Sequence, residues 1–325
     1  MSDFKGKKLH VKSPLVESRA LSVKSGIDRV LMKLDNTQPS DSFKLRGMGH
    51  HIQKEIERGC SKIVASSGGN AGLAAAYVAK RLNIPITIYT PESTPVKMRD
   101  RIALEGANVV VHGKNWNAAN DKATEDAKDP NCAFIHPYDH PNIWEGNSSI
   151  VEELYEDLGG VAPDVIAVSF GGGGLFCGVV QGLDKVGWSN VPILTMETVG
   201  ADCFNQAIKA GKVVFLQDIT SIAKSLGSLQ AAEQAFKYSK SHNILSEVIT
   251  DSQCINTCLQ FADDHRFLVE PACGAAITPF YVDLIPKLVA EGKLKPVKTA
   301  VVIVCGGHCV TYQMLQDWKK QVDGS

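Results

Sequence analysis

The sequence has almost no net charge and no long hydrophobic run. Its 34 lysine and arginine residues are balanced by 35 aspartate and glutamate residues, which gives a net charge of −1. Such a balance produces no field that would gather nucleic acid or an anionic membrane surface. Apolar stretches such as Thr299–Cys305 are far too short to span a bilayer, and the N-terminal segment MSDFKGKKLHVKSPL lacks the apolar core of a signal peptide. We therefore expect no nucleic-acid partner, no membrane insertion and a cytoplasmic location.

The sequence also lacks the cysteine patterns of disulfide frameworks and zinc sites. Its nine cysteines are an odd number spread over a long chain, which argues against a secreted, disulfide-bonded protein. Two pairs, Cys254/Cys258 and Cys305/Cys309, have a wider gap than the Cys-x-x-Cys knuckle typical of zinc sites. We expect most of these thiols to be small buried side chains.

What the sequence does contain is a regular alternation of short apolar segments with helix-like segments. The segments expected to form strands are Lys62–Ala65, Pro85–Tyr89, Asn108–Val111, Cys132–Ile135, Val165–Phe170, Ile193–Met196 and Ala300–Val304. The helix-like segments are residues 71–82, 96–105, 117–128, 147–158 and 175–186. Apolar strands that alternate with helices predict parallel sheets covered on both sides. The predicted fold class is therefore α/β, and 325 residues with 44% hydrophobic content suffice for two lobes.

Three loops that follow predicted strands carry unusual residues. Such loops meet at the carboxyl ends of parallel strands, where ligands bind. Gly171–Gly174 can bring backbone N–H groups close to a phosphate, although their spacing matches neither the dinucleotide fingerprint nor the P-loop. Ser66–Gly72 could hold a small carboxylate, but an ordinary helix cap has a similar composition. Cys305–Gly307 places a thiol at a strand end, where it either faces a ligand ring or packs inertly.

Lys44 stands between a polar loop and a predicted helix that runs to about Arg58. A lysine in such a place is usually solvated, but Phe43, Leu45 and Met48 around it are apolar, so the segment can lie inside the protein. Burial lowers the pKa of a lysine and makes it a nucleophile suited to Schiff-base chemistry.

Taken together, these segments resemble a known family. Lys44 within Ser-Phe-Lys-Leu-Arg-Gly and the three loops occur in the order and spacing of the fold-type II pyridoxal-phosphate enzymes, and the resemblance covers nearly the whole chain. That family includes serine and threonine dehydratases, serine racemase, cysteine synthase and the β subunit of tryptophan synthase. Further segments resemble the animal, liver-type L-serine and L-threonine dehydratases in particular, namely residues 9–14, 143–146, 178–183, 269–276 and 302–307.

The resemblance implies a role for each motif. It implies that Lys44 binds pyridoxal 5'-phosphate as a Schiff base and takes the α-proton of the substrate, while Phe43 packs on the pyridine ring. Asn70 is expected to contact the phenolic oxygen of the cofactor, and Cys305 is expected to face its ring nitrogen. The phosphate is expected to bind at Gly171, Gly172, Gly173, Gly174 and Leu175. The substrate carboxylate is expected at Ser67, Gly68, Gly69 and Asn70. A monovalent cation, K⁺ or Na⁺, is expected at Gly171, Glu197, Ala201, Leu226 and Ser228.

The resemblance also implies an architecture and a reaction. We expect a large cofactor-binding domain of residues 1–47 plus 138–325, a small substrate-closing domain of residues 48–137, and a homodimer. The implied reaction is the α,β-elimination of water from L-serine through an aminoacrylate, which hydrolyses to pyruvate and ammonia. L-threonine would give 2-oxobutanoate, and both reactions belong to amino-acid catabolism that supplies gluconeogenesis.

Three positions depart from the pattern of the resemblance. Gly68 stands where close relatives carry alanine and racemases carry serine, Ser225 stands where an alanine would pack on the ring, and His308-Cys309 replace Ser-Asn. We expect the missing methyl group at Gly68 to leave a small space in the pocket, so that Gly68→Ala would raise activity toward L-serine.

Other functions are weighed against the same residues. A racemase-like reaction is expected to be minor because Gly68 offers no acid on the face opposite Lys44, and a sulfhydrylase usually carries serine or threonine in place of Cys305. A cofactor-binding regulator with little turnover stays open as an alternative. The glycine spacing argues against a nicotinamide oxidoreductase.

Overall fold

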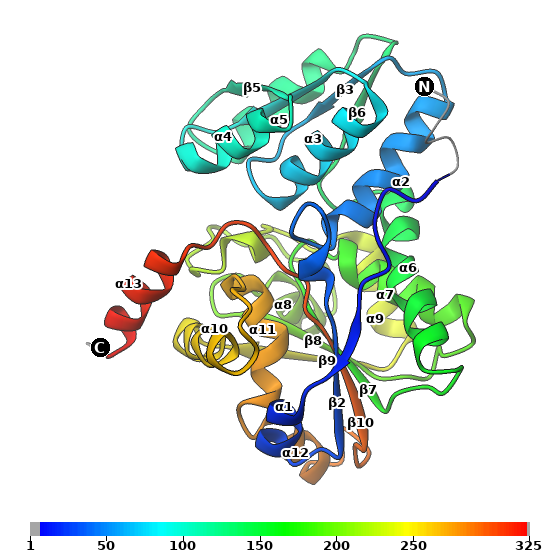
Figure 1. The fold of residues 1–325 in the computed structure, drawn as a ribbon, viewed down its shortest axis with the longest axis vertical. Helices are drawn as coiled ribbons and strands as arrows, with labels where there is room; N and C mark the ends of the chain where they lie inside the picture. The colour runs from blue at the N-terminus through cyan, green and yellow to red at the C-terminus, as the bar shows by residue number, and fades with distance from the viewer. Residues whose placement is uncertain (1–6, 324–325) are drawn as a thin grey trace. The chain divides into compact units, whose positions relative to one another are not determined.

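The computed structural model describes residues 7–323, which form two compact units. Unit 1 consists of the described residues up to Val11 together with Gln38–Asn147, and unit 2 consists of Lys12–Thr37 together with the described residues from Ser148 onward. Each unit has its own mostly parallel sheet flanked by helices, which confirms the predicted α/β fold (Figure 1). The assignment of cofactor binding and substrate closure to separate domains stays a prediction.

Unit 1 is built on four parallel strands in the order β5-β4-β3-β6. The strands are β3 (Lys62–Ala65), β4 (Ile86–Thr90), β5 (Asn108–Val111) and β6 (Cys132–Ile135). The helices are α2 (Lys44–Glu57), α3 (Asn70–Leu82), α4 (Val96–Leu104), α5 (Trp116–Asp126) and the first part of α6 (Pro141–Asp157). Because each strand is followed by a helix and all strands run the same way, the four strand-to-helix loops lie at one edge of the sheet.

Small residues let the helices of unit 1 approach one another closely. Helix α3 reads Asn-Ala-Gly-Leu-Ala-Ala-Ala-Tyr-Val-Ala, and its five alanines are buried. It packs against α2, and it ends at Asn83, which adopts the left-handed conformation that asparagine tolerates. Burial of alanine loses no side-chain rotamer freedom, so this tight packing has a small entropic cost.

Unit 2 contains a six-stranded sheet in the order β1-β2-β10-β7-β8-β9, parallel except for the pairing of β1 with β2. The strands are β1 (Leu15–Glu17), β2 (Arg29–Lys33), β7 (Val165–Ser169), β8 (Ile193–Thr198), β9 (Ile244–Ile249) and β10 (Thr299–Ile303). The helices are α1 (Arg19–Ser25), α7 (Gly174–Lys185), α8 (Cys203–Ala210), α9 (Glu233–Ser241), α10 (Asp251–His265), α11 (Pro271–Ile277), α12 (Leu284–Ala290) and α13 (Tyr312–Asp323). Strand β7 is buried at every residue, as its sequence, apolar except for Ser169, predicts.

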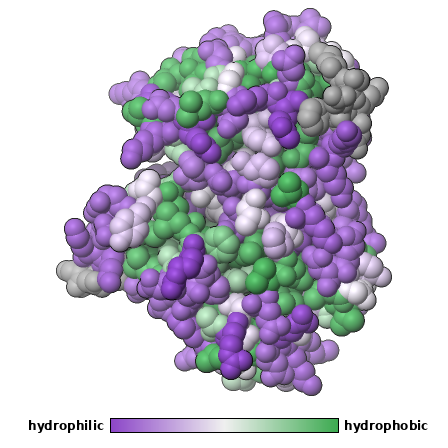
Figure 2. Space-filling view, in the orientation of Figure 1, coloured by the Kyte–Doolittle hydropathy of each residue, from purple (hydrophilic) through white to green (hydrophobic). Residues whose placement is uncertain are grey.

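The visible surface is largely hydrophilic, and the cysteines, all within the described residues, form no disulfide bonds. Figure 2 shows hydrophilic residues over much of the visible face, with hydrophobic residues in separate patches between them. Among the described residues, no single helix is long and apolar enough to cross a membrane, and only a bent pair, Pro271–Phe280 with Leu284–Ala290, meets the length and composition test jointly. Six of the nine cysteines are buried, as predicted, and all nine are free thiols.

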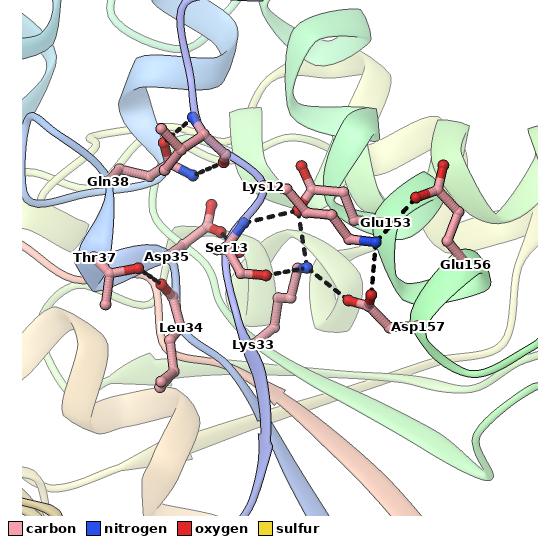
Figure 3. Close-up of polar contacts among 11 residues, drawn as sticks. Lys12, Ser13, Lys33, Leu34, Asp35, Thr37, Gln38, Glu153, Glu156 and Asp157 are labelled. Atoms are coloured by element: carbon pink, nitrogen blue, oxygen red, sulfur yellow. Dashed lines mark hydrogen bonds and ion pairs between the residues drawn. The ribbon is translucent and has the colours of Figure 1, made fainter.

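Strand β2 ends in a fully buried lysine, Lys33, which no motif in the sequence marks. The ammonium of Lys33 lies 2.8 Å from Glu153 Oε2 and 3.2 Å from Asp157 Oδ2, and it donates to the carbonyl of Ser13 at 2.7 Å (Figure 3). The hydroxyl of Ser13 in turn donates to Asp35 Oδ1 at 2.6 Å. A buried charge persists only when it is paired and hydrogen-bonded, so Lys33 has a structural role that joins β2 to α6.

Replacement of Lys33 by methionine should therefore destabilise the protein severely. The change removes the buried ammonium from beside the Glu153 and Asp157 carboxylates, which lowers the free energy of unfolding by about 3–5 kcal/mol. Urea denaturation measures the loss. The control is Lys12→Met, because Lys12 contacts Asp157 and Glu156 from an exposed position and its removal should change stability little. Equal, small effects of both substitutions would show that the buried network is not a major source of stability.

Candidate active site

Lys44 begins helix α2 at the edge of unit 1, where the strand-to-helix loops lie. It is half-buried, and its Nζ atom donates to the carbonyl of Pro137 at 2.8 Å, in the loop that follows β6. The same nitrogen lies 5.2 Å from the centroid of the Phe43 ring. Lys33, in contrast, is ion-paired with two carboxylates. Of these two lysines, Lys44 is the one that lies at the edge of the sheet beside a strand-to-helix loop, whereas Lys33 is held inside unit 2 by its ion pairs.

The position of Lys44 depends on a close crossing of helices α2 and α6. A Cβ atom on Gly47 would lie 2.7 Å from Ile143 Cγ2, and one on Gly146 would lie 2.8 Å from His50 Cβ. Real side chains do not approach so closely, so only glycine permits this crossing. The crossing fixes the start of α2 against the loop that carries Pro137. Sequence reasoning did not assign this role to either glycine, although a glycine inside a helical segment signals such a contact.

The loop between β3 and α3, residues 66–70, is held by helix α5. Ser66 is fully buried; its hydroxyl donates to Asn120 Oδ1 at 2.7 Å, and its carbonyl accepts from Trp116 Nε1 at 2.6 Å. The hydroxyl of Ser67 accepts from the amide of Gly69 at 3.4 Å. The predicted substrate-binding residues therefore lie in one tethered turn at the N-terminus of α3. Trp116 and Asn120 were missed because nothing in their local sequence points to a loop fifty residues earlier.

Two uncharged histidines line the loop that follows β6. The Nδ1 atom of His136 accepts from the amides of Tyr138 and Asp139 at 3.3 and 2.8 Å, which leaves the proton of the neutral ring on Nε2. Burial, aided by the nearby Lys44 ammonium, lowers the pKa of His136 to about 4. His51 stacks on His140 with ring centroids 3.9 Å apart, and burial together with His140 lowers the pKa of His51 to about 3. Both rings are thus neutral at physiological pH.

In unit 2, the four glycines 171–174 connect β7 to α7. Gly173 has a φ of +104°, and a Cβ atom on Gly171 would lie 3.2 Å from the Cα atom of Leu226. The first turn of α7, which includes Leu175, contains no acidic side chain. The loop therefore requires glycine where the chain turns, and it ends at a helix N-terminus that favours an anion.

Cys305 lies just beyond β10 and is 5% exposed. Its Sγ atom is 3.8 Å from the hydroxyl of Ser169, which itself donates to the carbonyl of Ala272 at 2.6 Å. Burial, followed by the neighbouring Cys305 thiol, raises the pKa of Cys273 well above its ordinary value. The end of β10 is therefore lined by the thiols of Cys305 and Cys273 and the hydroxyl of Ser169, and the buried carboxyl group of Glu270 lies against Gly307.

The predicted cation ligands all lie in unit 2, in two groups: Glu197 and Ala201 near the end of β8, and Gly171 beside Leu226, with Ser228 close by in sequence. Glu197 at the end of β8 is fully buried, and its two oxygens accept from the amides of Phe204 and Asn205 at 2.9 and 2.7 Å. Burial raises the pKa of Glu197 to about 8. Ala201 lies in the turn that leads from β8 to α8, while Gly171 lies against Leu226, and the Ser228 hydroxyl donates to the carbonyl of Gln230. A common cation site at these residues stays a prediction.

The space expected beside Gly68 does not exist, so that expectation was wrong. A Cβ atom on Gly68 would lie 2.6 Å from Thr94 Cγ2 and 3.1 Å from Thr94 Cβ, with Thr94 Oγ1 closer still. Thr94 belongs to the neighbouring loop after β4 and fills the volume that a methyl group would occupy. Addition of that methyl group would create a collision instead of repairing a cavity, and the packing argument for Gly68→Ala fails.

The predicted site residues thus form two sets. Unit 1 contains Phe43, Lys44 and the turn from Ser67 to Asn70 at one edge of its sheet. Unit 2 contains the glycine loop, Cys305 and the proposed cation ligands at the carboxyl ends of β7, β8 and β10. The convergence of the two sets on one cofactor stays a prediction.

Comparison with known proteins gives consistent matches over almost the whole chain. Residues 7–306 match the family described as pyridoxal-phosphate dependent enzyme. A serine dehydratase-like protein of Homo sapiens is 50% identical over 311 residues, covering 95% of this chain and 94% of that one. The L-serine dehydratase/L-threonine deaminase of Homo sapiens is 48% identical over 319 residues, covering 98% and 97%. The crystal structure of a fungal L-serine ammonia-lyase from Rhizomucor miehei superposes with a TM-score of 0.91 at 32% identity, covering 97% and 99%.

The residues of both units fit the cofactor of that family. The glycine loop offers backbone amides without a neighbouring acidic side chain in the first turn of α7, as a phosphate dianion requires. A Cβ atom on Gly171 would lie 3.2 Å from Leu226 Cα and one on Gly173 would lie 3.0 Å from Ala235 Cβ, so a side chain at either position would be tightly packed, and the positive φ of Gly173 also favours glycine. Lys44 presents an amine bonded to a neutral carbonyl, which suits a lysine that must react with a carbonyl group.

The tether of Ser66 by Trp116 can be tested without any ligand. Trp116→Phe removes the N–H donor to the Ser66 carbonyl, a loss of about 1 kcal/mol, so amide exchange across residues 66–70 should become roughly fivefold faster. Hydrogen–deuterium exchange with mass spectrometry measures this. Trp188→Phe, in unit 2, is the matched control and should leave the loop unchanged. Unaltered exchange in the Trp116 variant would mean that α5 does not hold the loop.

The neutral His51 ring predicts a loss of stability in acid. Its pKa is lower in the folded chain than in the unfolded one, so the unfolded chain binds the extra proton between about pH 6.5 and pH 3. The contribution of His51 to the free energy of unfolding is therefore fully present above pH 6.5. Below that pH the free energy of unfolding falls by up to about 1.4 kcal/mol per pH unit. Urea midpoints at pH 7 and pH 5 should show a smaller loss in His51→Gln than in the parent. His112→Gln, at an exposed histidine, should keep the parent's loss, and a parent-like loss in His51→Gln would contradict the assignment.

Proposed function

Because the chain belongs to the family of pyridoxal-phosphate dependent enzymes, we propose that it is an ammonia-lyase acting on L-serine and L-threonine. The net reaction converts L-serine to pyruvate and ammonia, and L-threonine to 2-oxobutanoate and ammonia. The observation that carries the proposal is the placement of Lys44, with its amine bonded to a neutral carbonyl at the edge of the sheet, in a chain 48% identical to an L-serine dehydratase/L-threonine deaminase.

The cofactor would be held by residues from both sets. Lys44 would be the attachment amine, Phe43 would cover the ring, and Asn70 would bond the phenolic oxygen. The backbone amides of Gly171 to Leu175 would hold the phosphate, and Cys305 would face the ring nitrogen. When bound, the cofactor supplies the electron sink that makes the substrate Cα–H acidic.

The chain's own residues bind and orient the substrate and move its proton. The turn from Ser67 to Asn70 lies at the N-terminus of the 13-residue helix α3, whose amides and positive end suit the substrate carboxylate. Lys44 is the base that removes the α-proton, since its amine is already directed to the edge where this turn lies. The rings of His136, just after β6, and of His51, in α2, are neutral and so add no further positive charge near Lys44.

Several finer features complete the proposal. K⁺ or Na⁺ would bind at Gly171, Glu197, Ala201, Leu226 and Ser228, where a cation would favour the ionised form of the buried Glu197 carboxyl. Nine free cysteines support a reducing, cytoplasmic location. The homodimer and the division into a large cofactor-binding domain and a small closing domain are retained from the resemblance.

Lys44→Ala should abolish the reaction, because no other amine would be placed both to hold the cofactor and to take the α-proton. Release of pyruvate and ammonia from L-serine should fall by more than about 1000-fold. Borohydride reduction of the parent should fix the cofactor on the peptide that contains residue 44, as mass spectrometry would show. The control is Lys54→Ala, an exposed position on the same helix, which should retain parent activity. Reduction onto a different lysine, or turnover by Lys44→Ala, would overturn the assignment.

A further inference from the structure

Gly68 and Thr94 share one small volume in unit 1. Gly68 lies in the turn after β3, and Thr94 lies in the loop of residues 91–95 after β4, the neighbouring strand in the sheet. A Cβ atom on Gly68 would be 2.6 Å from Thr94 Cγ2 and 3.1 Å from Thr94 Cβ. The side chain of Thr94 therefore stands where a side chain of residue 68 would otherwise be, in the middle of the turn that we propose to bind the substrate carboxylate.

Thr94 cannot move aside easily. The amide of Thr94 donates to the carbonyl of Pro91 at 3.0 Å, and Thr94 as a whole is only 8% exposed. Pro95 follows it and caps α4 with φ −56° and ψ 139°, while the carbonyl of Pro95 accepts from the amides of Met98 and Arg99. A residue before proline has a restricted backbone, and a β-branched side chain has a restricted χ1. The position of the Thr94 side chain is therefore fixed by its own loop and not by Gly68.

The hydroxyl groups around this turn differ in their bonding. The Ser66 hydroxyl donates to Asn120, and the Ser67 hydroxyl accepts from the Gly69 amide. Within residues 7–323, the hydroxyl of Thr94 has no hydrogen-bond partner. A polar group held rigidly beside a binding turn and left without a protein partner is placed to bond a ligand.

We propose that Thr94 is a substrate-binding residue whose hydroxyl donates to the substrate carboxylate, while its methyl group and Cβ replace the side chain absent at Gly68. The proposal rests on the function proposed above, because it takes the turn of residues 67–70 as the carboxylate site. It assigns the pair a joint role: in this chain the side chain of Thr94 lines the turn at the position where Gly68 has no side chain. Binding strength toward the amino-acid substrate would then depend on a loop that no motif of the chain identified.

The hydroxyl is tested with two substitutions of opposite character. Thr94→Val keeps the shape but removes the donor, and Thr94→Ser keeps the donor but removes the methyl group. KM for L-serine should rise about tenfold in Thr94→Val, with kcat changed little, since the loss of one hydrogen bond to a charged group weakens binding of substrate and transition state alike. Thr94→Ser should keep KM within about threefold of the parent. An unchanged KM in Thr94→Val, with the parent active, would overturn the role of Thr94 while leaving the proposed function intact.

The shared volume is tested by a double-mutant cycle read from melting temperatures of the cofactor-free protein, which needs no activity. Gly68→Ala should lower the melting temperature in the parent, and the penalty should be largely relieved when Thr94→Ala is also present, because Thr94 Oγ1 and Cγ2 are then gone. The matched control is Gly49→Ala, where the nearest contact of a new Cβ is Leu9 Cβ at 3.5 Å and no penalty is expected. An equal penalty in both backgrounds would refute the steric pairing. Absence of serine turnover in the parent would refute the proposed function and the substrate role together, whereas the melting cycle would still decide the packing.

Discussion

The parallel pairing of β3, β4, β5 and β6 is the constraint on which the candidate site depends. Because the four strands run in one direction, the loops that follow them must lie at the same edge of the sheet. One of these loops is the predicted substrate turn, and the loop after β6 holds the amine of Lys44 through the carbonyl of Pro137. The loops after β4 and β5 lead to Thr94 and Trp116, which contact that turn. The chemistry of unit 1 therefore follows from strand direction and not from the proximity of residues in sequence.

The electrostatic design of the two units separates structural charges from reactive ones. In unit 2 the buried ammonium of Lys33 is matched by Glu153 and Asp157 and is unavailable for chemistry. In unit 1 the Lys44 amine donates to the carbonyl of Pro137, and burial holds the pKa of His136 and of His51 far below the physiological range, so both rings are uncharged. The buried Lys33 ammonium thus has a structural role, whereas Lys44 lies beside the loops at the edge of the sheet, as an attachment lysine must.

Much of the fold could be predicted from the sequence where local signals were strong. The strands β3, β5 and β6 have the predicted bounds, because each is a short apolar segment between polar turns. β9 was missed because it is a half-exposed strand whose sequence, Ile-Leu-Ser-Glu-Val-Ile, mixes polar and apolar residues. β2 was missed because it begins and ends with charged residues, and its terminal lysine is accommodated only by distant carboxylates.

The site was predictable only in part, for a related reason. Lys44 and the glycine loop belong to contiguous motifs that can be recognised by eye. Thr94, in the loop after β4, and Trp116 and Asn120, in helix α5, act on the loop after β3 from 26 to 54 residues further along the chain, so no local pattern marks them. The expectation for Gly68 was wrong for the same reason: an absent methyl group implies a cavity only if no neighbour fills it, and Thr94 does.

The central claim is that this chain converts L-serine to pyruvate and ammonia with a pyridoxal-phosphate cofactor. The most direct measurement is the amount of pyruvate and of ammonia released when L-serine is added to the protein reconstituted with that cofactor. The account predicts equal amounts of the two products, in large excess over the protein. Ammonia without pyruvate, D-serine as the main product, or no change in L-serine would contradict it.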